Sequence, residues 1–161
     1  MSPSEQHDKT AMYALSVGDL VKARCYLQHL HLEQPNTLRQ AILEAAIIAY
    51  ARPFTPNRYP HGKHYLASGV VPVDARQLHD EIIELRDRVI AHTDYEPVAP
   101  RVKSETMGTS ISGTNTDTLD RFRERLPQLE SLFGRTCDNL LREFKVQIAA
   151  FEAESKPNAH N

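Results

Sequence analysis

Arg86 and His92 are the two side chains of this sequence whose types and spacing point to a chemistry. A histidine titrates near neutral pH and can move a proton, whereas an arginine stays charged and binds two phosphate oxygens with its planar guanidinium. At one site the two groups could cleave RNA without a metal ion. The imidazole would take the proton of the ribose 2′-hydroxyl or protonate the leaving oxygen, and the guanidinium would stabilise charge on the phosphorane.

Arg86 is also out of place in its local pattern. Residues 74–91 read as an amphipathic helix, and on a helical wheel Arg86 falls in the middle of an apolar arc formed by Leu78, Ile82, Ile83, Leu85, Val89 and Ile90. Burying an unpaired guanidinium costs several kcal/mol, so either Arg86 pairs with a carboxylate or this face opens onto a cleft or a partner. On a regular helix the Arg86 and His92 side chains diverge by about 120°. They converge if the helix loosens near His92 or if two subunits face each other.

The stretch Arg86–His92, RDRVIAH, resembles the signature of the HEPN superfamily, in which an arginine and a polar residue precede a histidine. The resemblance implies a helical bundle that forms a homodimer, with the arginine and histidine of both subunits lining a shared cleft. It implies that Arg86 stabilises the phosphate, that His92 acts as acid or base, and that Asp87 orients both. Many members are metal-independent endoribonucleases of toxin–antitoxin or phage-defence systems, which implies RNA as substrate and an antitoxin protein as partner.

The proline-rich segment 52–73 is a second candidate for contacts with RNA. Its lysine and arginines are not balanced by any acidic residue, and aromatic residues are interleaved with them. Such cations bind phosphates, and exposed aromatic rings stack on unpaired bases. The predicted substrate-binding residues are therefore Arg52, Arg58, Lys63, Tyr59 and, beside the motif, Arg88. The alternative is a surface loop, stiffened by its prolines, that packs its aromatic rings on the bundle.

Apolar periodicity predicts four main helices, over residues 10–32, which Gly18 could break, and over residues 37–51, 74–91 and 118–154. Asn36 is the expected N-cap of the second helix, and Pro127 must kink or split the last one. Four helices in sequence predict an all-α, up-and-down helical bundle of HEPN-like type.

The connections complete this picture of one domain. Long loops are expected over residues 52–73 and 93–117, and the second of them could form a short hairpin. The single domain then covers residues 10–154, with a flexible N-terminus at residues 1–9 and a flexible tail at residues 155–161.

The composition is that of an ordinary globular protein, with 161 residues, 25% of them charged, and a net charge of −2. Without a global basic field, any binding of nucleic acid must come from a local patch. Cys25 and Cys137 lie far apart, as expected of buried thiols in a reducing compartment, and the scattered histidine and cysteine pairs lack a third metal ligand. No segment has the apolar length of a leader or a membrane span. We therefore expect a cytoplasmic protein with no cofactor, no metal and no membrane partner.

Three interpretations remain open on the sequence. The first is a metal-independent endoribonuclease centred on Arg86 and His92. The second is a non-catalytic, dimeric interaction module of HEPN type, in which the same two residues hold the dimer or a ligand. The third is a helical scaffold in which Arg86 only forms an ion pair in the core.

Overall fold

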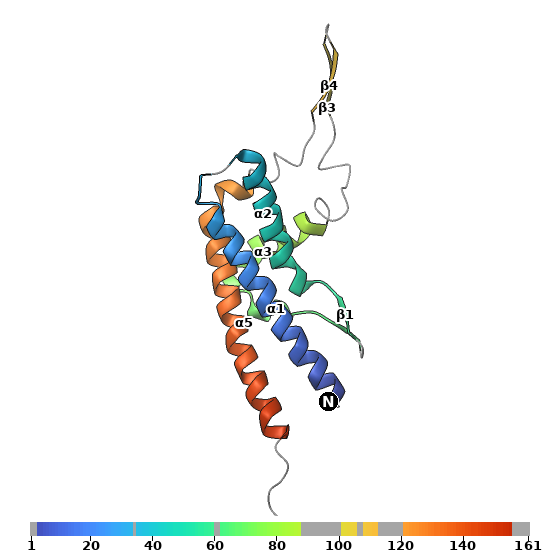
Figure 1. Cartoon of the computed structure of the whole chain (residues 1–161), viewed down its shortest axis with the longest axis vertical. Helices are drawn as coiled ribbons and strands as arrows, with labels where there is room; N and C mark the ends of the chain where they lie inside the picture. The colour runs from blue at the N-terminus through green and yellow to red at the C-terminus, as the bar shows by residue number, and fades with distance from the viewer. Residues whose placement is uncertain are drawn as a thin grey trace, which may run out of the picture.

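The structure, a computed structural model, describes residues 3–33, 35–59, 62–87, 101–105, 108–112 and 121–155. Within these residues the main elements are four helices (Figure 1): α1 (Pro3–His29), α2 (Asn36–Ala51), α3 (Arg76–Leu85) and α5 (Leu126–Ser155). The predicted all-α helical bundle is confirmed.

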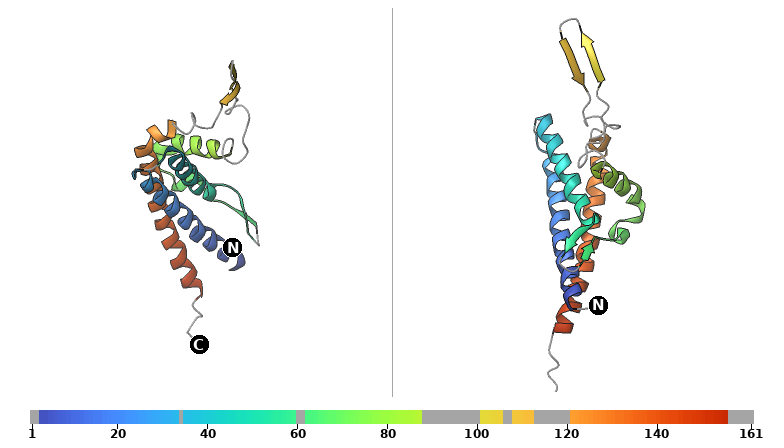
Figure 2. Two further views of the ribbon diagram at one scale, coloured as in Figure 1. Left: turned by 45° about the horizontal axis from the view of Figure 1, so that its top comes forward. Right: turned by 90° about the vertical axis from the view of Figure 1, so that its right-hand side faces the viewer.

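The three long helices and the short α3 form two layers. α1 packs against both α2 and α5 and runs antiparallel to them (Figure 1). α3 crosses the long helices on the side of α2 and α5 that faces away from α1 (Figure 2). Because α3 contacts both α2 and α5, it closes the open side of the three-helix layer.

Side chains from all four helices meet in one hydrophobic core. Full burial of a leucine, isoleucine or phenylalanine side chain stabilises the fold by about 1.5–3 kcal/mol, so the apolar spacing that predicts the helices also holds them together. The largest fully buried apolar side chains are Tyr50, Phe133, Leu20, Leu27, Leu43, Ile47, Ile82, Leu129, Leu132 and Leu140.

α1 begins earlier than the periodicity predicts, so residues 3–9 are helical and the prediction of a flexible segment there is wrong. The reason is that the first turns bury polar side chains, which an apolar pattern cannot reveal: Gln6 is 9% exposed and Asp8 is 3% exposed. α1 also continues through Gly18, where the sequence allowed a break. A glycine inside a helix costs about 1 kcal/mol relative to alanine, and the buried Leu20 on the same helix outweighs that cost.

The two cysteines differ in their surroundings. Cys137 on α5 is fully buried, as predicted, whereas Cys25 on α1 is exposed, and for this residue the prediction is wrong. The helical repeat explains the difference, because the neighbouring Ala23 and Leu27 take the two buried positions of that turn and leave Cys25 on the outer face.

Between α2 and α3 the segment predicted as a loop has secondary structure of its own. It contains an antiparallel hairpin of β1 (Asn57–Tyr59) and β2 (Gly62–His64), and 3₁₀ turns at Arg52–Phe54, Ser68–Val70 and Val73–Ala75. The Leu66 N–H donates to the Pro53 carbonyl over 2.8 Å and ties the two ends of the segment together. At the start of α2, Pro35 rather than the predicted Asn36 occupies the N-cap position.

Pro127 splits the last predicted helix, because a proline inside a helix lacks the N–H that the ladder needs. Residues 121–124 are helical, Arg125 forms a turn, and α5 begins at Leu126. This leaves Pro127 in the first turn of α5, where the missing N–H has no cost.

Within the segment 93–117, predicted as a long loop that could form a hairpin, a hairpin is present. β3 (Arg101–Glu105) and β4 (Gly108–Ser112) pair antiparallel, with Arg101 opposite Ser112 and Glu105 opposite Gly108. Of the tail predicted as flexible, Ser155 is the last residue of α5, and residues 156–161 lie outside the described residues.

Candidate functional site

As a regular α-helix, α3 ends at Leu85, one residue before the HEPN-like motif begins at Arg86. α3 covers Arg76–Leu85 and is shorter at both ends than the predicted 74–91. Residues 73–75 form a 3₁₀ turn, and Arg86 and Asp87 adopt a π-helical turn. A helical wheel of a regular α-helix therefore does not apply to Arg86 and Asp87.

Arg86 is partly buried and pairs with its own neighbour. Its side chain is 27% exposed, and Nη1 donates to Oδ1 of Asp87 over 2.5 Å. The carboxylate that a cation in this arc requires therefore comes from the next residue rather than from another helix. Leu85, one position earlier, is 4% exposed, so burial decreases sharply at the end of α3 and the guanidinium lies at the edge of the core.

Two members of the predicted site fall outside the described residues. These are His92, the predicted acid or base, and Arg88, both in the segment 88–100. Of the predicted catalytic residues, the structure brings Arg86 and Asp87 together.

The predicted substrate-binding cations of the 52–73 segment lie in two places. Arg58 and Tyr59 belong to β1, and Lys63 belongs to β2, with Arg58 directly opposite Lys63 in the register of the hairpin. Their side chains lie outside what the structure describes. Arg52 follows α2, and its Nη1 donates to Oδ1 of Asp19 on α1 over 2.9 Å, so this cation is directed at α1 rather than at α3.

A cavity of about 430 Å³ joins this segment to α3. We call it the His79 pocket. The segment 52–73 contributes Phe54, Tyr65, Leu66, Ala67 and Ser68 to its lining. α3 contributes His79, Asp80, Ile83 and Glu84. The pocket thus lies on the helix that leads into Arg86.

His79 is held by the core at the base of this pocket. The residue is 5% exposed, and its Nδ1 lies 2.9 Å from the hydroxyl of Tyr50 on α2. Tyr50 in turn stacks on Phe133 of α5, with the ring centroids 4.1 Å apart and the planes 4° from parallel. The edge of the His79 ring also meets Phe54, at 4.6 Å between centroids. Three helices and the loop segment therefore fix the position of one imidazole.

Burial decides the protonation of both partners. It lowers the pKa of His79, and the nearby negative charge of Asp80 opposes that shift. Burial likewise raises the pKa of Tyr50. At neutral pH the imidazole and the phenol are both uncharged, and one ring nitrogen of a neutral imidazole donates a hydrogen bond while the other accepts one.

The sequence interpretation missed His79 and Tyr50. One local signal was available, since His79 precedes Arg86 by seven residues and lies on the same side of the helical wheel. Nothing local links His79 to Tyr50, because the two residues are brought together only when α2 and α3 pack.

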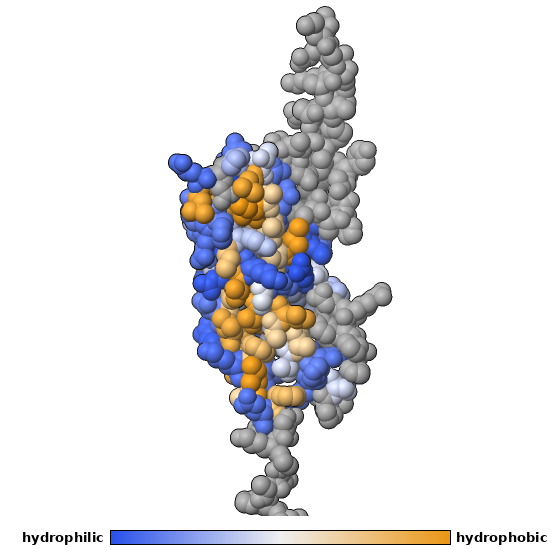
Figure 3. Space-filling view, in the orientation of Figure 1, coloured by the Kyte–Doolittle hydropathy of each residue, from blue (hydrophilic) through white to orange (hydrophobic). Residues whose placement is uncertain are grey.

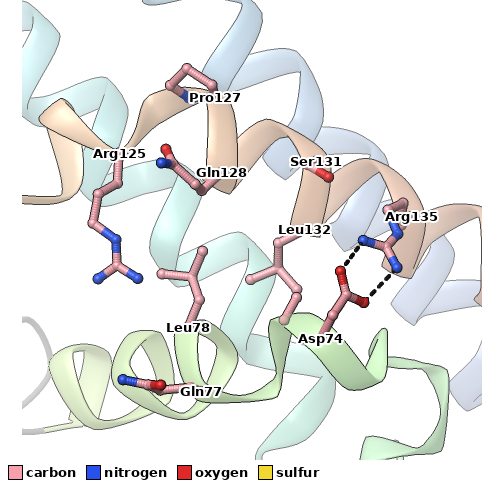
Figure 4. A pocket seen from close by; sticks show the side chains of 10 residues that line it. Asp74, Gln77, Leu78, Arg125, Pro127, Gln128, Ser131, Leu132 and Arg135 are labelled. Carbon is pink, nitrogen blue, oxygen red and sulfur yellow. Dashed lines mark hydrogen bonds and ion pairs between the residues drawn. The ribbon is translucent and has the colours of Figure 1, made fainter.

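A second cavity, of about 490 Å³, lies between α3 and the start of α5 (Figure 4). Its two arginines are both engaged. Arg135 makes two hydrogen bonds of 2.7 Å to the carboxylate of Asp74, which lower the pKa of that carboxyl. Arg125 donates to Glu81 over 2.5 Å. The first pair joins the 3₁₀ turn at residues 73–75 to α5, and the second joins α3 to the turn that precedes α5.

The residues that the structure describes form neither a metal site nor a membrane span. In these residues no three histidine, cysteine or acidic side chains converge in a way that could hold a metal ion. No helix in the same residues combines the length and the apolar character needed to cross a bilayer.

No protein-family model matches this chain, and no curated protein or solved structure matches it either.

Proposed function

We propose that this protein is a metal-independent endoribonuclease of HEPN type that acts in a cytoplasmic toxin or defence system. In this proposal Arg86 stabilises the phosphate undergoing transfer, His92 moves the proton, and Asp87 orients the guanidinium. The observation that carries the proposal is the change from α-helix to π-helical turn at Arg86, together with the ion pair that the turn presents at the edge of the bundle. π-Helical turns are rare and are frequent at functional sites.

The Arg86–Asp87 pair accounts for the cation in the apolar arc. An arginine that served only as a core ion pair would be expected to reach a carboxylate on another helix, as Arg125 does with Glu81. Arg86 instead pairs with an adjacent carboxylate that is 47% exposed. Since an arginine has five N–H donors, a phosphate can bind the remaining ones without displacing Asp87.

The proposed homodimer has to use a particular side of the molecule. Apolar residues gather along the face on which α1 lies in front (Figure 3). α1 itself carries exposed apolar side chains, with Leu15 62% exposed and Val21 43% exposed. α3 lies on the other side of the bundle (Figure 2). A dimer with a shared Arg86 cleft must therefore form at the C-terminal end of α3, which leaves the face of α1 for a different partner, such as the proposed antitoxin protein.

The test is cleavage of a single-stranded RNA by the purified full chain in the presence of EDTA. The proposal expects products with 2′,3′-cyclic phosphate ends. Both His92→Ala and Arg86→Ala should lower the rate at least about 100-fold, the usual contribution of an acid–base group. The side chain of His7 on α1 is 75% exposed. His7→Ala is therefore the matched control and should cleave RNA at the wild-type rate. Intact RNA at high concentrations of folded wild-type protein would refute the enzyme.

A second function, a non-catalytic interaction module, is favoured by one observation. The acidic Asp80 lines the His79 pocket on the helix that precedes Arg86, and a negative charge there repels a nucleic-acid backbone. In this proposal no RNA is cut, and Arg86→Ala weakens the dimer or the binding of a ligand. Sedimentation of wild type and variant at matched concentrations separates the two functions.

A further inference from the structure

We propose that the His79 pocket binds an organic ammonium cation that carries an apolar body, such as an arylalkylamine. The cavity, about 430 Å³, falls within the range of small-molecule sites, which is about 300–1,000 Å³. The inference does not depend on RNA cleavage, because it uses neither Arg86 nor His92.

Aromatic rings form the apolar part of the pocket. Tyr65 is 57% exposed, although tyrosine is a residue that usually buries most of its ring. Phe54 is held between two rings, at 5.5 Å from Tyr50 and 4.6 Å from His79. The face of an aromatic ring attracts a cation, and the attraction grows when the cation is partly removed from water.

A carboxylate sets the charge that the pocket prefers. Asp80 lines the cavity next to His79 on α3, and none of the lining residues is a lysine or an arginine. The negative charge of Asp80 partly opposes the effect of burial on the pKa of His79. The carboxylate therefore attracts a cation that enters the pocket and repels an anion.

His79 supplies an orienting group. Its Nδ1 is taken by the Tyr50 hydroxyl, and no described residue forms a hydrogen bond with its Nε2. A phenol can accept as well as donate, so Nδ1–H can donate to Tyr50 and leave the lone pair of Nε2 for a ligand N–H. A primary ammonium group has three N–H donors, of which one can go to Nε2 of His79 and another to the carboxylate of Asp80, both of which line the pocket.

The experiment titrates the full chain with phenethylammonium and follows the imidazole signals of His79 by NMR. Two probes of similar shape serve as comparisons: phenethyl alcohol, which is neutral, and hydrocinnamate, which is an anion. The proposal expects saturable binding of the cation with a shift of the His79 signals, weaker binding of the alcohol, and no binding of the anion.

Two variants locate the site. Asp80→Asn should weaken binding of phenethylammonium about tenfold, which corresponds to one unit in the logarithm of the dissociation constant. Glu33→Gln removes the same charge from an exposed position between α1 and α2, at the opposite end of α2 from Tyr50, and should bind as wild type does. Tyr65→Ala, an exposed position whose change leaves the core intact, should also weaken binding.

Three outcomes would overturn the proposal. These are equal affinity for the cation and the anion, full affinity in folded Asp80→Asn, and saturable binding that leaves the His79 signals unmoved. Loss of RNA cleavage in the Arg86 and His92 variants, or its absence in wild type, bears on the endoribonuclease alone.

Discussion

Tyr50 and His79 share a hydrogen bond of 2.9 Å inside the bundle, and this bond joins α2 to α3. Both side chains are almost fully removed from solvent. A buried donor or acceptor that loses its partner costs about 1–3 kcal/mol, more than an intact bond contributes. The pair therefore specifies how α3 sits on the bundle, because any other placement leaves two polar groups without partners.

The first prediction concerns the phenol oxygen. Tyr50→Phe keeps the ring that stacks on Phe133 but leaves Nδ1 of His79 unpaired. We expect the free energy of unfolding to fall by about 1–3 kcal/mol, measured by urea denaturation at neutral pH. Tyr26→Phe, at a position that is 38% exposed, is the matched control and should change stability by less than about 0.5 kcal/mol. Equal stability of Tyr50→Phe and wild type would contradict the role assigned to the bond.

The second prediction concerns pH. Because burial lowers the pKa of His79 in the folded state, the unfolded chain binds a proton first as pH falls. Stability should therefore decrease from about pH 6.5, the ordinary pKa of histidine, down through the lower pKa of the folded protein. Below that value both states are protonated and the contribution of His79 stays constant. The groups that face the ring are Tyr50, Asp80 and the other acid of the pocket, Glu84.

The measurement is the free energy of unfolding at several pH values between about 5 and 8, compared with the same curve for His79→Asn. The variant is expected to be less stable at neutral pH and to lose the part of the slope that His79 causes. Identical slopes in the two proteins would show that the imidazole titrates normally in the fold.

The third prediction separates structure from chemistry at Arg86. Its partner Asp87 is about half exposed, and an exposed ion pair contributes about 0–1 kcal/mol. Arg86→Met keeps the packing of the side-chain stem, so we expect little change in the melting temperature, whereas Arg86→Ala should lower it slightly. If the proposed endoribonuclease is correct, both variants lose activity equally. A fully active Arg86→Met would remove Arg86 from the mechanism.

The fourth prediction uses the two cysteines. Cys25 is exposed, whereas Cys137 is buried and burial raises the pKa of its thiol. Since the thiolate is the reactive form, a chromogenic disulfide reagent should modify one thiol quickly and the other only after unfolding. Cys25→Ser should abolish the fast phase, and Cys137→Ser should leave it unchanged. Two fast thiols in the wild-type protein would mean that this part of α5 opens readily.

Helix positions were predictable because they depend on local spacing. The apolar repeat placed the four main helices, and Pro127 correctly marked a break because its effect on the backbone is intrinsic. The start of α1 was not predictable from that repeat, because Gln6 and Asp8 are buried although they are polar.

The candidate site was predictable only where its partners are adjacent in the chain. A helical wheel separates neighbours by about 100°, so it did not suggest that Asp87 would neutralise Arg86. The His79 pocket combines α3 with residues that precede His79 by 11 to 25 positions, from Ser68 back to Phe54. Contacts of that range follow from how helices pack, which a single sequence does not encode in any local pattern.

The hydrophobic core has a consequence for engineering the chain. Among the described residues, every core member comes either at or before Leu85 or at or after Phe122. The stretch between them, which includes His92, can therefore be exchanged for a short flexible connection without removing any of those core side chains. If the proposed endoribonuclease is correct, the shortened chain lacks its histidine, and mixing it with the intact chain would reveal whether activity needs one His92 or two.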